Sequence, residues 1–475
     1  KTMFDKSVYT GRRNRLKKEL KSGIALFLGN VDAAFNYPAN QYHFRQDSNF
    51  SYFFGLNNPG FAGVIDVDND KDTIFGNDVD IDDIIWMGVQ PLVKDLAAQV
   101  GIEKSFPYDD LAGFIEKVTS EGRKVHFLPP YRGETVIELS ALLNIPNAEV
   151  KPAASVDLIK AVVKLREIKD ENEITEIEKA LLTAYYMHTT SMKMAKPGVV
   201  EQDIAGTIEG ISLAMTGPIS FPVILSVDGQ TLHNHSHHNV LKEGRMMVTD
   251  AGSETALHYA SDITRTVPVG GKFNARQAEI YQIVLDANMN SINAIKPGVP
   301  YKEIHFLAAR TIVDGLKAAG LMKGDTEAAV QAGAHTLFLP HGLGHMMGLD
   351  VHDMEGLGED YVGYDETVSR SDQFGTAYLR LAKVLKPGFV LTVEPGIYFI
   401  PDLIDKFRSE GKFLDFVNYD KLETYKDFGG IRIEDDILVT AGGCRVLGKP
   451  IPKTIAGVEK TMAEPREWLK KEGFI

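Results

Sequence analysis

The sequence has 475 residues, of which 44% are hydrophobic and 24% charged, and its 65 acidic residues outnumber the 51 basic ones to give a formal net charge of −14. This length and composition are typical of a globular protein with two or three domains and argue against a disordered chain. The negative charge disfavours nucleic acid and anionic membranes as partners. No apolar run approaches the roughly 20 residues that a membrane span needs.

The cysteine content and the first residues bear on the compartment. Cys444 is the single cysteine, so no intrachain disulfide can form, which fits a reducing compartment. Residues 1–20, KTMFDKSVYTGRRNRLKKEL, contain no apolar core of the kind found in a signal peptide. We therefore expect a cytoplasmic protein that binds neither nucleic acid nor membranes.

The first part of the chain mixes two kinds of pattern. Short apolar runs typical of strands, IALFLG, AGVIDV and DIIWMG, alternate with helical patterns such as LVKDLAAQV, which predicts an α/β domain. The aromatic stretch FRQDSNFSYFFG is predicted to be a buried strand. Near Ser155 the pattern changes to apolar residues at helical spacing among dense charges. We therefore predict an amino-terminal α/β domain over residues 1–155 and a second domain over 156–475.

The second domain contains a weak internal repeat. MAKPGVVEQDI (194–204) and AIKPGVPYKEI (294–304) share KPGV, an acidic residue and isoleucine at an offset of 100, and each predicts a helix, a Pro-Gly stop and a second helix. LKEGRMMVTDAG (241–252) resembles LKPGFVLTVEPG (385–396) at an offset of 144, which aligns Asp250 with Glu394. Two halves, each of helices followed by strands, predict a duplicated α+β domain with its cavity between the halves.

Four carboxylates lie at the ends of predicted buried strands. Asp250 and Glu394 end the β-branched stretches MMVTDAG and VLTVEPG, and the predicted partner strands YASDITRTVPV and GGIRIEDDILVT contribute Asp262 and Glu434. Any one of them could simply cap a turn. Four in two matched pairs could not all stay ionised unless cations neutralised them, and two divalent ions would balance four negative charges. The sequence therefore predicts a dinuclear metal site.

The stretch HGLGHMMGLDVHD carries His341, His345 and His352. A zincin helix would need glutamate directly after the first histidine, but glycine stands there, and two further glycines weaken a helix. A strand or loop is predicted instead. A lone histidine is usually structural, but three beside glycines favour a functional site.

The series Asp250, Asp262, His345, Glu394 and Glu434 resembles the five-ligand set of the pita-bread metallopeptidases, a family that includes methionine aminopeptidase, prolidase and aminopeptidase P. Xaa-Pro aminopeptidases (aminopeptidase P) are the most similar members, because NYPANQYHFRQDSNFSYFFGLNNPG (36–60) looks like their amino-terminal signature. The resemblance runs from about residue 12 to about residue 440. It implies an α/β amino-terminal domain and a duplicated pita-bread catalytic domain.

The resemblance also implies a role for each ligand. Asp250 would be a bidentate ligand of one metal ion, His345 and Glu394 would hold the other, and Asp262 and Glu434 would bridge both. An oxygen-rich set with one imidazole and no thiolate suits two divalent ions of manganese, cobalt, iron or zinc. Manganese is what the family leads us to expect.

Other residues match family positions near the metals. In TLHNHSHHNV, His233 is the counterpart of a histidine that contacts substrate, and His341, His352 and Arg432 match two further histidines and an arginine. His235, His237 and His238 have no counterpart, and we predict that they are loop or rim residues.

The family usually separates its two aspartates by eleven positions, whereas Asp250 and Asp262 are twelve apart. A bulge, a longer turn or an alignment slip would explain the difference, and the intact flanks TDAG and DITRT favour the bulge. Two long stretches, 359–384 and 399–428, adjoin the ligand motifs, and we expect them to wall the cleft.

The implied activity is that of an Xaa-Pro aminopeptidase, which removes the residue before proline from peptides by metal-bound hydroxide attack, with Glu394 relaying a proton. Prolidase, limited to dipeptides, uses the same ligands and stays open as an alternative. A metal-free pita-bread protein that binds peptides or proteins, or a metal-free hydrolase of the creatine type, would lack ligands that are all present here. Since the family's amino-terminal domain takes part in oligomer contacts, we expect a homodimer.

Overall fold

The computed structural model describes residues 3–465. Their contacts form two compact units: one comprises the described residues up to Arg166 together with Met354–Tyr361, and the other comprises Glu167–Asp353 and the described residues from Val362 onward. The predicted boundary at 155/156 lies eleven residues before the division at 166/167. Each unit is described by itself.

The first unit is built on a mixed five-stranded sheet with the order β6-β5-β4-β1-β7. Strand β4 (Ala62–Asp66) pairs antiparallel with β1 (Ile24–Leu28) and β5 (Lys71–Phe75), while β7 (Val125–His126) and β6 (Lys104–Phe106) add parallel edges. The helices are α1 (Lys6–Glu19), α2 (Ser48–Phe54), α3 (Ile81–Met87), α4 (Val93–Gln99), α5 (Asp110–Ser120), α6 (Gly133–Leu143), α7 (Asn147–Val150) and α8 (Val156–Arg166). The predicted α/β class is confirmed.

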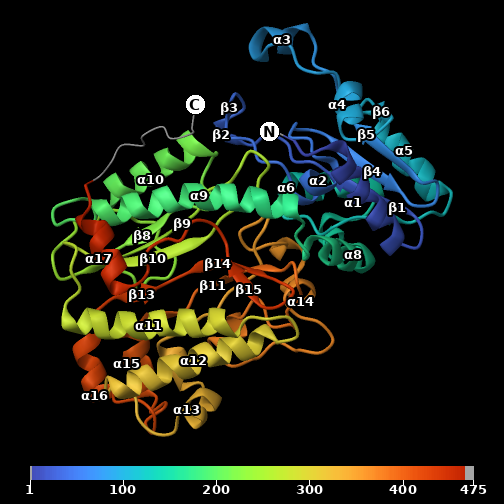
Figure 1. The fold of residues 1–475 in the computed structure, drawn as a ribbon. Coiled ribbons are helices and arrows are strands. Elements are labelled where there is room, and N and C mark those ends of the chain that lie inside the picture. The colour runs from blue at the N-terminus through green and yellow to red at the C-terminus, as the bar shows by residue number, and fades with distance from the viewer. Residues whose placement is uncertain (1–2, 466–475) are drawn as a thin grey trace. The chain divides into compact units, whose positions relative to one another are not determined.

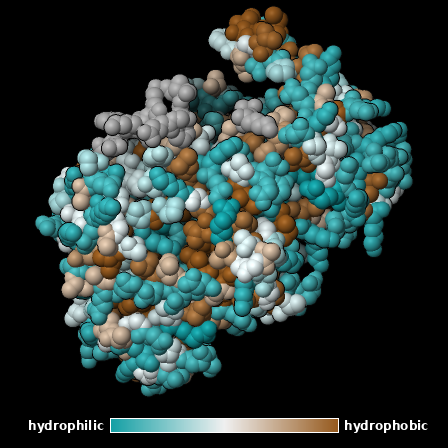
Figure 2. Space-filling view, in the orientation of Figure 1, coloured by the Kyte–Doolittle hydropathy of each residue, from teal (hydrophilic) through white to brown (hydrophobic). Residues whose placement is uncertain are grey.

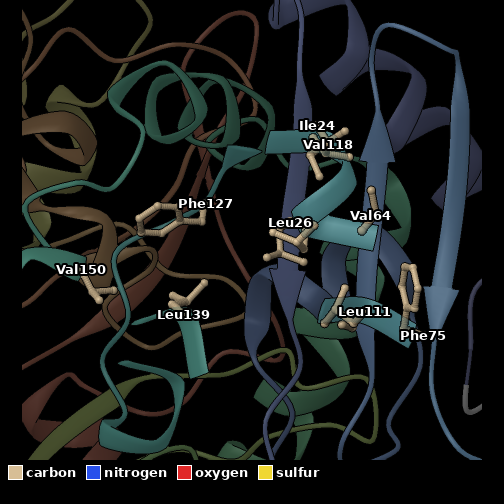
Figure 3. Packing of buried hydrophobic residues seen from close by; sticks show 11 residues of the cluster. Ile24, Leu26, Val64, Phe75, Leu111, Val118, Phe127, Leu139 and Val150 are labelled. Carbon is tan, nitrogen blue, oxygen red and sulfur yellow. The ribbon is translucent and has the colours of Figure 1, made fainter. Parts of the chain in front are cut away.

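Period-two alternation places one face of this sheet in the core. Figure 3 shows Leu26 of β1, Val64 of β4 and Phe75 of β5 beside Leu111 and Val118 of α5, all of them members of one buried hydrophobic cluster. Because side chains i and i+2 share a sheet face, the apolar run IALFL buries its alternate residues against α5 and can also bury the others behind the sheet.

Two sequence predictions for this unit are wrong. FRQDSNFSYFFG contains helix α2 and no strand: Asp47 caps it by accepting from the Phe50 backbone N–H at 2.9 Å, and Gly55 ends it at φ 64°. Its aromatic residues at positions 50, 53 and 54 are buried, as predicted, but they follow helical spacing.

DIIWMG likewise forms part of helix α3, with a capping box between Asp80 and Asp83. Its apolar side chains Ile85, Trp86 and Met87 are exposed, and they contribute to the brown cluster at the position of α3 in Figure 2.

The second unit places short strands between two pairs of long helices (Figure 1). The helix pairs are α9 (Glu171–Met194) with α10 (Glu201–Met215), and α11 (Ala275–Ala294) with α12 (Tyr301–Ala318). The strands form the orders β10-β9-β8, β11-β14-β15 and β12-β13, with β8 (Ile224–Ser226), β9 (Met246–Ala251), β10 (Ile263–Pro268), β11 (Val390–Val393), β12 (Gly396–Tyr398), β13 (Gly430–Arg432), β14 (Asp435–Val439) and β15 (Cys444–Val446). Each half therefore runs from helices to strands, as predicted.

Backbone hydrogen bonds of the two halves correspond at both offsets found in the sequence. In each half, the KPGV turn lies between the two long helices and contains a glycine with positive φ, 88° at Gly198 and 87° at Gly298. The backbone of each turn is hydrogen-bonded to a leucine further along the chain. The bonds are Gly198 N–H to Leu241 O (2.8 Å) and Leu241 N–H to Val199 O (2.8 Å) in the first half, and Gly298 N–H to Leu385 O (3.0 Å) and Leu385 N–H to Val299 O (2.9 Å) in the second. This matched set supports the predicted duplication more strongly than the sequence repeat does.

The hairpin between the two aspartates has no bulge. Asp250 pairs with Thr264 and Ala251 with Ile263, and an isolated bridge between Glu254 and Ala260 continues in the same register. The ladder therefore runs without a shift toward the turn at residues 255–259. A longer turn accounts for the spacing of twelve, and the predicted bulge is wrong.

The other described elements are β2 (Ala34–Tyr37), β3 (Asn40–Gln41), α13 (Thr326–Ala332), η1 (Ala334–Leu337), η2 (Glu355–Leu357), α14 (Glu359–Val362), η3 (Thr376–Tyr378), α15 (Pro401–Ser409), α16 (Tyr419–Leu422), η4 (Glu423–Tyr425) and α17 (Ile455–Ala463). None of the described helices combines the length and the apolar character that a membrane crossing requires.

Candidate active site

Two cavities of about 310 and 300 Å³ lie in the second unit and share five lining residues: His233, Asp250, His345, His352 and Glu394. Asp262 also lines the first cavity, and His341 and Arg432 line the second. Glu434 is fully buried behind them. All nine candidate site residues are thus brought together, and the lining comes from both halves, as the duplication predicted.

Strand pairing explains why the four carboxylates meet. Asp250 lies on β9 and Asp262 directly precedes the neighbouring strand β10, two register positions away, so their side chains share a sheet face. Val393 pairs with Asp435 and Gly396 with Arg432, which places Glu394 opposite Glu434 in the gap between the two ladders. The predicted partner strands are therefore the observed ones.

An imidazole joins these carboxylates. One ligand atom each from Asp262, His345 and Glu434 lie within 4.8 Å of one another. The His345 Nε2 atom is 3.3 Å from Asp262 Oδ2 and 3.3 Å from Glu394 Oε1. On the other side of the ring, Nδ1 donates to the Met346 carbonyl at 2.9 Å. This bond orients the ring so that Nε2 is the nitrogen that faces the carboxylates and is placed to bind a metal ion.

The carboxylates are crowded electrostatically. Burial, together with the charges of Asp262 and Glu394, raises the pKa of Asp250 to about 7 even though Arg432 opposes the shift. Burial and the same neighbouring charges hold the pKa of Glu434 well above its usual range. Burial acts in the same direction on Glu394, but the hydrogen bond and charge of His345 lower the pKa of that carboxyl. The cluster lacks enough positive charge of its own to ionise all four acids.

The donor atoms of this cluster fit divalent cations. Asp250 Oδ1 and Glu434 Oε1 are buried without a hydrogen-bond partner among the residues that the structure describes. Buried carboxylate oxygens of this kind are costly unless a cation binds them. Four carboxylates and one imidazole form an oxygen-rich donor set that suits divalent metal ions.

A hydrogen-bonded chain supports the cluster, and it joins the predicted residues Arg432 and His341 through Tyr398, which the sequence-based prediction did not include. Arg432 Nη2 donates to Asp250 Oδ2 at 2.7 Å, and its Nη1 donates to the Tyr398 hydroxyl at 2.9 Å. That hydroxyl lies 2.8 Å from His341 Nε2, whose ring donates through Nδ1 to the Gly342 carbonyl. The signal for Tyr398 was its place in VEPGIY, two residues beyond Gly396 and four beyond Glu394, on the same strand face.

The histidines come from loops. His341, His345 and His352 lie in the irregular segment before η2, in agreement with the prediction of a strand or loop. The rings of His345 and His352 are 4.3 Å apart between centroids. In the other histidine-rich loop, His235 lines the first cavity beside His233, whereas His237 and His238, both of which the structure describes, line neither. His237 Nδ1 lies 2.9 Å from the Leu225 carbonyl oxygen.

The two stretches expected to wall the cleft differ. Tyr378 and Arg380 of the segment 359–384 line the second cavity, as predicted. The segment 399–428, all of which the structure describes, contributes to neither cavity. Its aromatic residues instead gather around Phe399, whose ring centroid lies 5.0 Å from those of Tyr425 and Phe428. The first cavity is also lined by four apolar residues, Phe221, Pro222, Ile224 and Val351.

Two family models match the chain. The model of metallopeptidase family M24 matches residues 175–441, and that of the aminopeptidase P N-terminal domain matches residues 9–126.

Named relatives and solved structures extend these matches to most of the chain. The Xaa-Pro dipeptidase of Homo sapiens is 31% identical over 485 residues, covering 96% of this chain and 93% of the relative. A probable Xaa-Pro aminopeptidase of Leptosphaeria maculans is 32% identical, covering 87% and 70%. The structures of Pseudomonas aeruginosa aminopeptidase PepP and of zinc-substituted E. coli aminopeptidase P with product each match with a TM-score of 0.80 at 27% identity. Both matches cover 98% of this chain, with 99% and 100% of the respective structures.

Proposed function

Because this chain belongs to metallopeptidase family M24, we propose that its cleft hydrolyses the bond before proline at the second position of a peptide. The chain is a metallopeptidase hydrolase, an Xaa-Pro aminopeptidase, with a fold like that of aminopeptidase P over nearly its whole length. The observation that carries this function is the meeting of carboxylates from both halves with His345 in one cleft. Peptides with an Xaa-Pro amino terminus are its substrates.

The proposed metal ligands are Asp250 for one ion, His345 and Glu394 for the other, and Asp262 and Glu434 for both. Their support is the donor chemistry of the cluster and the two buried carboxylate oxygens without hydrogen-bond partners. We propose manganese as the physiological metal. The zinc-substituted structure describes the E. coli relative and does not identify the metal of this chain.

When bound, two divalent cations lower the pKa of a water molecule toward neutrality and polarise the scissile carbonyl. Glu394 Oε1 lies 3.2 Å from the Thr392 hydroxyl, which orients the carboxylate and leaves it placed to carry the water proton toward the departing proline nitrogen. His352, and His341 together with Tyr398, supply groups that can hydrogen-bond the tetrahedral oxyanion or the substrate backbone. We propose that His233 contacts the substrate and that Arg432 orients Asp250.

The substrate's chemistry fits this cleft. The bond before proline has no N–H and constrained torsion angles, so a dedicated pocket must position it. The free amine of the substrate carries a positive charge, and the carboxylates of Asp250, Asp262 and Glu394 line the cavity that would receive it. The apolar wall around Phe221 can hold the amino-terminal side chain.

One observation favours prolidase as a second candidate. Arg380 lines the second cavity, where a guanidinium can bind the carboxylate of a dipeptide through two parallel hydrogen bonds. The human relative with matching coverage is a dipeptidase. Both activities need the same metal ligands, so only substrate length separates them.

We further propose a cytoplasmic homodimer with an amino-terminal domain over 1–155 and a pita-bread catalytic domain over 156–475. The single cysteine fits a reducing compartment. Helix α3 exposes Ile85 (70%) and Trp86 (87%), and a second copy of the chain would cover such apolar side chains. Sedimentation velocity of the unmodified protein and of Ile85→Asp tests the dimer, since the variant should shift it to monomer.

The test of the function is release of alanine from Ala-Pro-Ala, with Ala-Ala-Ala as the matched peptide. Cleavage of the proline peptide alone is expected, because the cleft must position a tertiary amide. Equal cleavage of both peptides would contradict proline specificity, and cleavage of neither would contradict the aminopeptidase.

A further inference from the structure

The short segment Glu167-Ile168-Lys169, between α8 and α9, makes two buried ion pairs with distant parts of the second unit. Lys169 Nζ lies 2.6 Å from Asp353 Oδ2, and both side chains are 1% exposed. Glu167 Oε2 lies 2.6 Å from Lys383 Nζ, and both of these side chains are 6% exposed. Well-packed apolar residues would stabilise the fold equally well, so stability alone does not explain two such pairs.

The first pair closes the loop that carries His345 and His352. Within this loop the Asp353 N–H donates to the Met346 carbonyl at 2.9 Å, and Asp353 Oδ1 accepts from the Asp350 N–H at 3.3 Å. Asp353 directly follows His352 in the sequence, and its hydrogen bonds to Met346 and Asp350 join the two ends of the loop. The Lys169 ammonium is buried against it.

Close packing at Gly348 fixes the geometry of this pair. A Cβ atom at Gly348 would lie 2.8 Å from Lys169 Cε and 2.9 Å from Asp353 Oδ2. The Gly348 carbonyl accepts from the Ala260 N–H at 2.9 Å, which connects the loop to the hairpin just before Asp262. The Lys169 side chain therefore packs directly against Gly348 and Asp353, so a displacement of this side chain would be transmitted to the loop that carries His352.

The second pair holds the cleft segment that carries Tyr378 and Arg380. Lys383 follows Arg380 by three residues, and its backbone N–H donates to the Gly363 carbonyl at 2.9 Å, which folds the segment back on itself. Its carbonyl accepts from the Tyr301 N–H at 3.0 Å at the start of α12. Glu167 thus binds the segment at the point where it returns to the helices.

We propose that Glu167 and Lys169 are positioning residues of the cleft. Lys169 acts through Asp353 on His352 and His345, and Glu167 acts through Lys383 on Arg380. The assignment of these targets to catalysis and to substrate binding rests on the proposed function. The positioning itself is a property of the fold and can be measured without substrate.

Hydrogen–deuterium exchange of the full chain with manganese present tests the positioning. Lys169→Met should speed exchange of amides in 346–353 by about tenfold or more and leave 363–383 unchanged, because local opening follows the loss of buried contacts. Glu167→Met should have the converse effect. Lys426→Met, which breaks a pair with Asp405 on the surface, is the matched control and should change neither segment. Unchanged exchange in both variants, or equal loosening of both segments by each, would overturn the proposal.

Steady-state kinetics then distinguish the effect of Lys169 on catalysis from the effect of Glu167 on substrate binding. Lys169→Met should lower kcat for Ala-Pro-Ala by about 10²-fold with KM nearly constant, the scale expected when a catalytic group moves by about 1 Å. Glu167→Met should instead raise KM for Ala-Pro while kcat changes little. Identical kinetics in the unmodified protein and both variants would overturn the proposed effects of Lys169 on catalysis and of Glu167 on substrate binding.

The proposal stays testable if Lys169→Met does not fold or if the unmodified protein cleaves neither peptide. If Lys169→Met does not fold, the double variant Lys169→Met/Asp353→Asn removes both charges and should still show faster exchange in 346–353; a protected segment would overturn the proposal. If the unmodified protein cleaves neither peptide, the proposed function fails while the exchange data still decide the positioning.

Discussion

Two buried histidines should make the fold sensitive to mild acid. His305 on α12 and His335 on η1 are 1% and 0% exposed, with ring centroids 6.3 Å apart. Their four ring nitrogens have no hydrogen-bond partner among the described residues. Burial lowers the pKa of His305 to about 3 and that of His335 to about 4. Both rings are therefore neutral in the folded protein at pH 7.

The magnitude follows from proton linkage. In the unfolded chain both histidines have a pKa near 6.5, above the folded values, so the unfolded state binds more protons at mildly acidic pH. Their contribution to stability is complete above about pH 6.5 and is lost as the pH falls toward the folded values. Lowering the pH from 7 to 5 should cost about 2 kcal/mol for each residue and about 4 kcal/mol for the pair.

Urea unfolding at pH 7 and pH 5 measures this loss. The variants His305→Phe and His335→Phe should each reduce the acid-induced loss of unfolding free energy by about 2 kcal/mol, because a phenyl ring binds no proton. His43→Phe, at an exposed position, is the control and should leave the loss unchanged. Metal release at low pH affects all four proteins alike and cancels in the comparison. An undiminished loss in both buried variants would refute the reasoning.

Three substitutions test the site. Glu394→Ala should abolish turnover while melting curves show a folded protein, since proton transfer alone contributes about 10²–10⁴-fold; near-normal activity would contradict the mechanism. His237→Ala removes only a contact to the Leu225 carbonyl, so kcat/KM should change less than about twofold; a hundredfold loss would place His237 in the site. Arg380→Met should raise KM for Ala-Pro by about 10–100-fold, the scale of a charge-assisted hydrogen bond; an unchanged KM would remove the support for dipeptide binding.

The sequence predicted well which carboxylates meet, because strand periodicity and motif spacing determine which side chains of paired strands share a face. Asp250 and Glu394 follow apolar stretches whose pairing partners carry Asp262 and Glu434, and a two-residue period leaves little freedom in which face they share. The sequence predicted that the segment 359–384 lines the cleft but did not single out Arg380, because this segment is irregular and reaches the cleft through tertiary contacts.

The wrong predictions have local causes, whereas the ion pairs that the sequence did not reveal are long-range. The stretches around Phe50 and Ile85 are short and apolar, and such runs do not distinguish a strand from a helix; the caps from Asp47 and Asp80 decide for a helix in each case. The extra residue between Asp250 and Asp262 could be a bulge or a longer turn by sequence alone, and only the register of the paired strands distinguishes them. The buried ion pairs of Glu167 and Lys169 depend on partners about 200 residues away, which no local pattern could reveal.

Hydrolysis of Ala-Pro-Ala and Ala-Pro, measured side by side with metal stripped and then with manganese restored, tests the central assignment most directly. Cleavage of the tripeptide should disappear on stripping and return with manganese, because the five proposed ligands cannot promote the reaction without the ions they hold. Cleavage of the dipeptide alone would favour prolidase. Tripeptide cleavage that persists without metal, or that is absent when manganese is bound to the folded protein, would contradict a metal-dependent Xaa-Pro aminopeptidase.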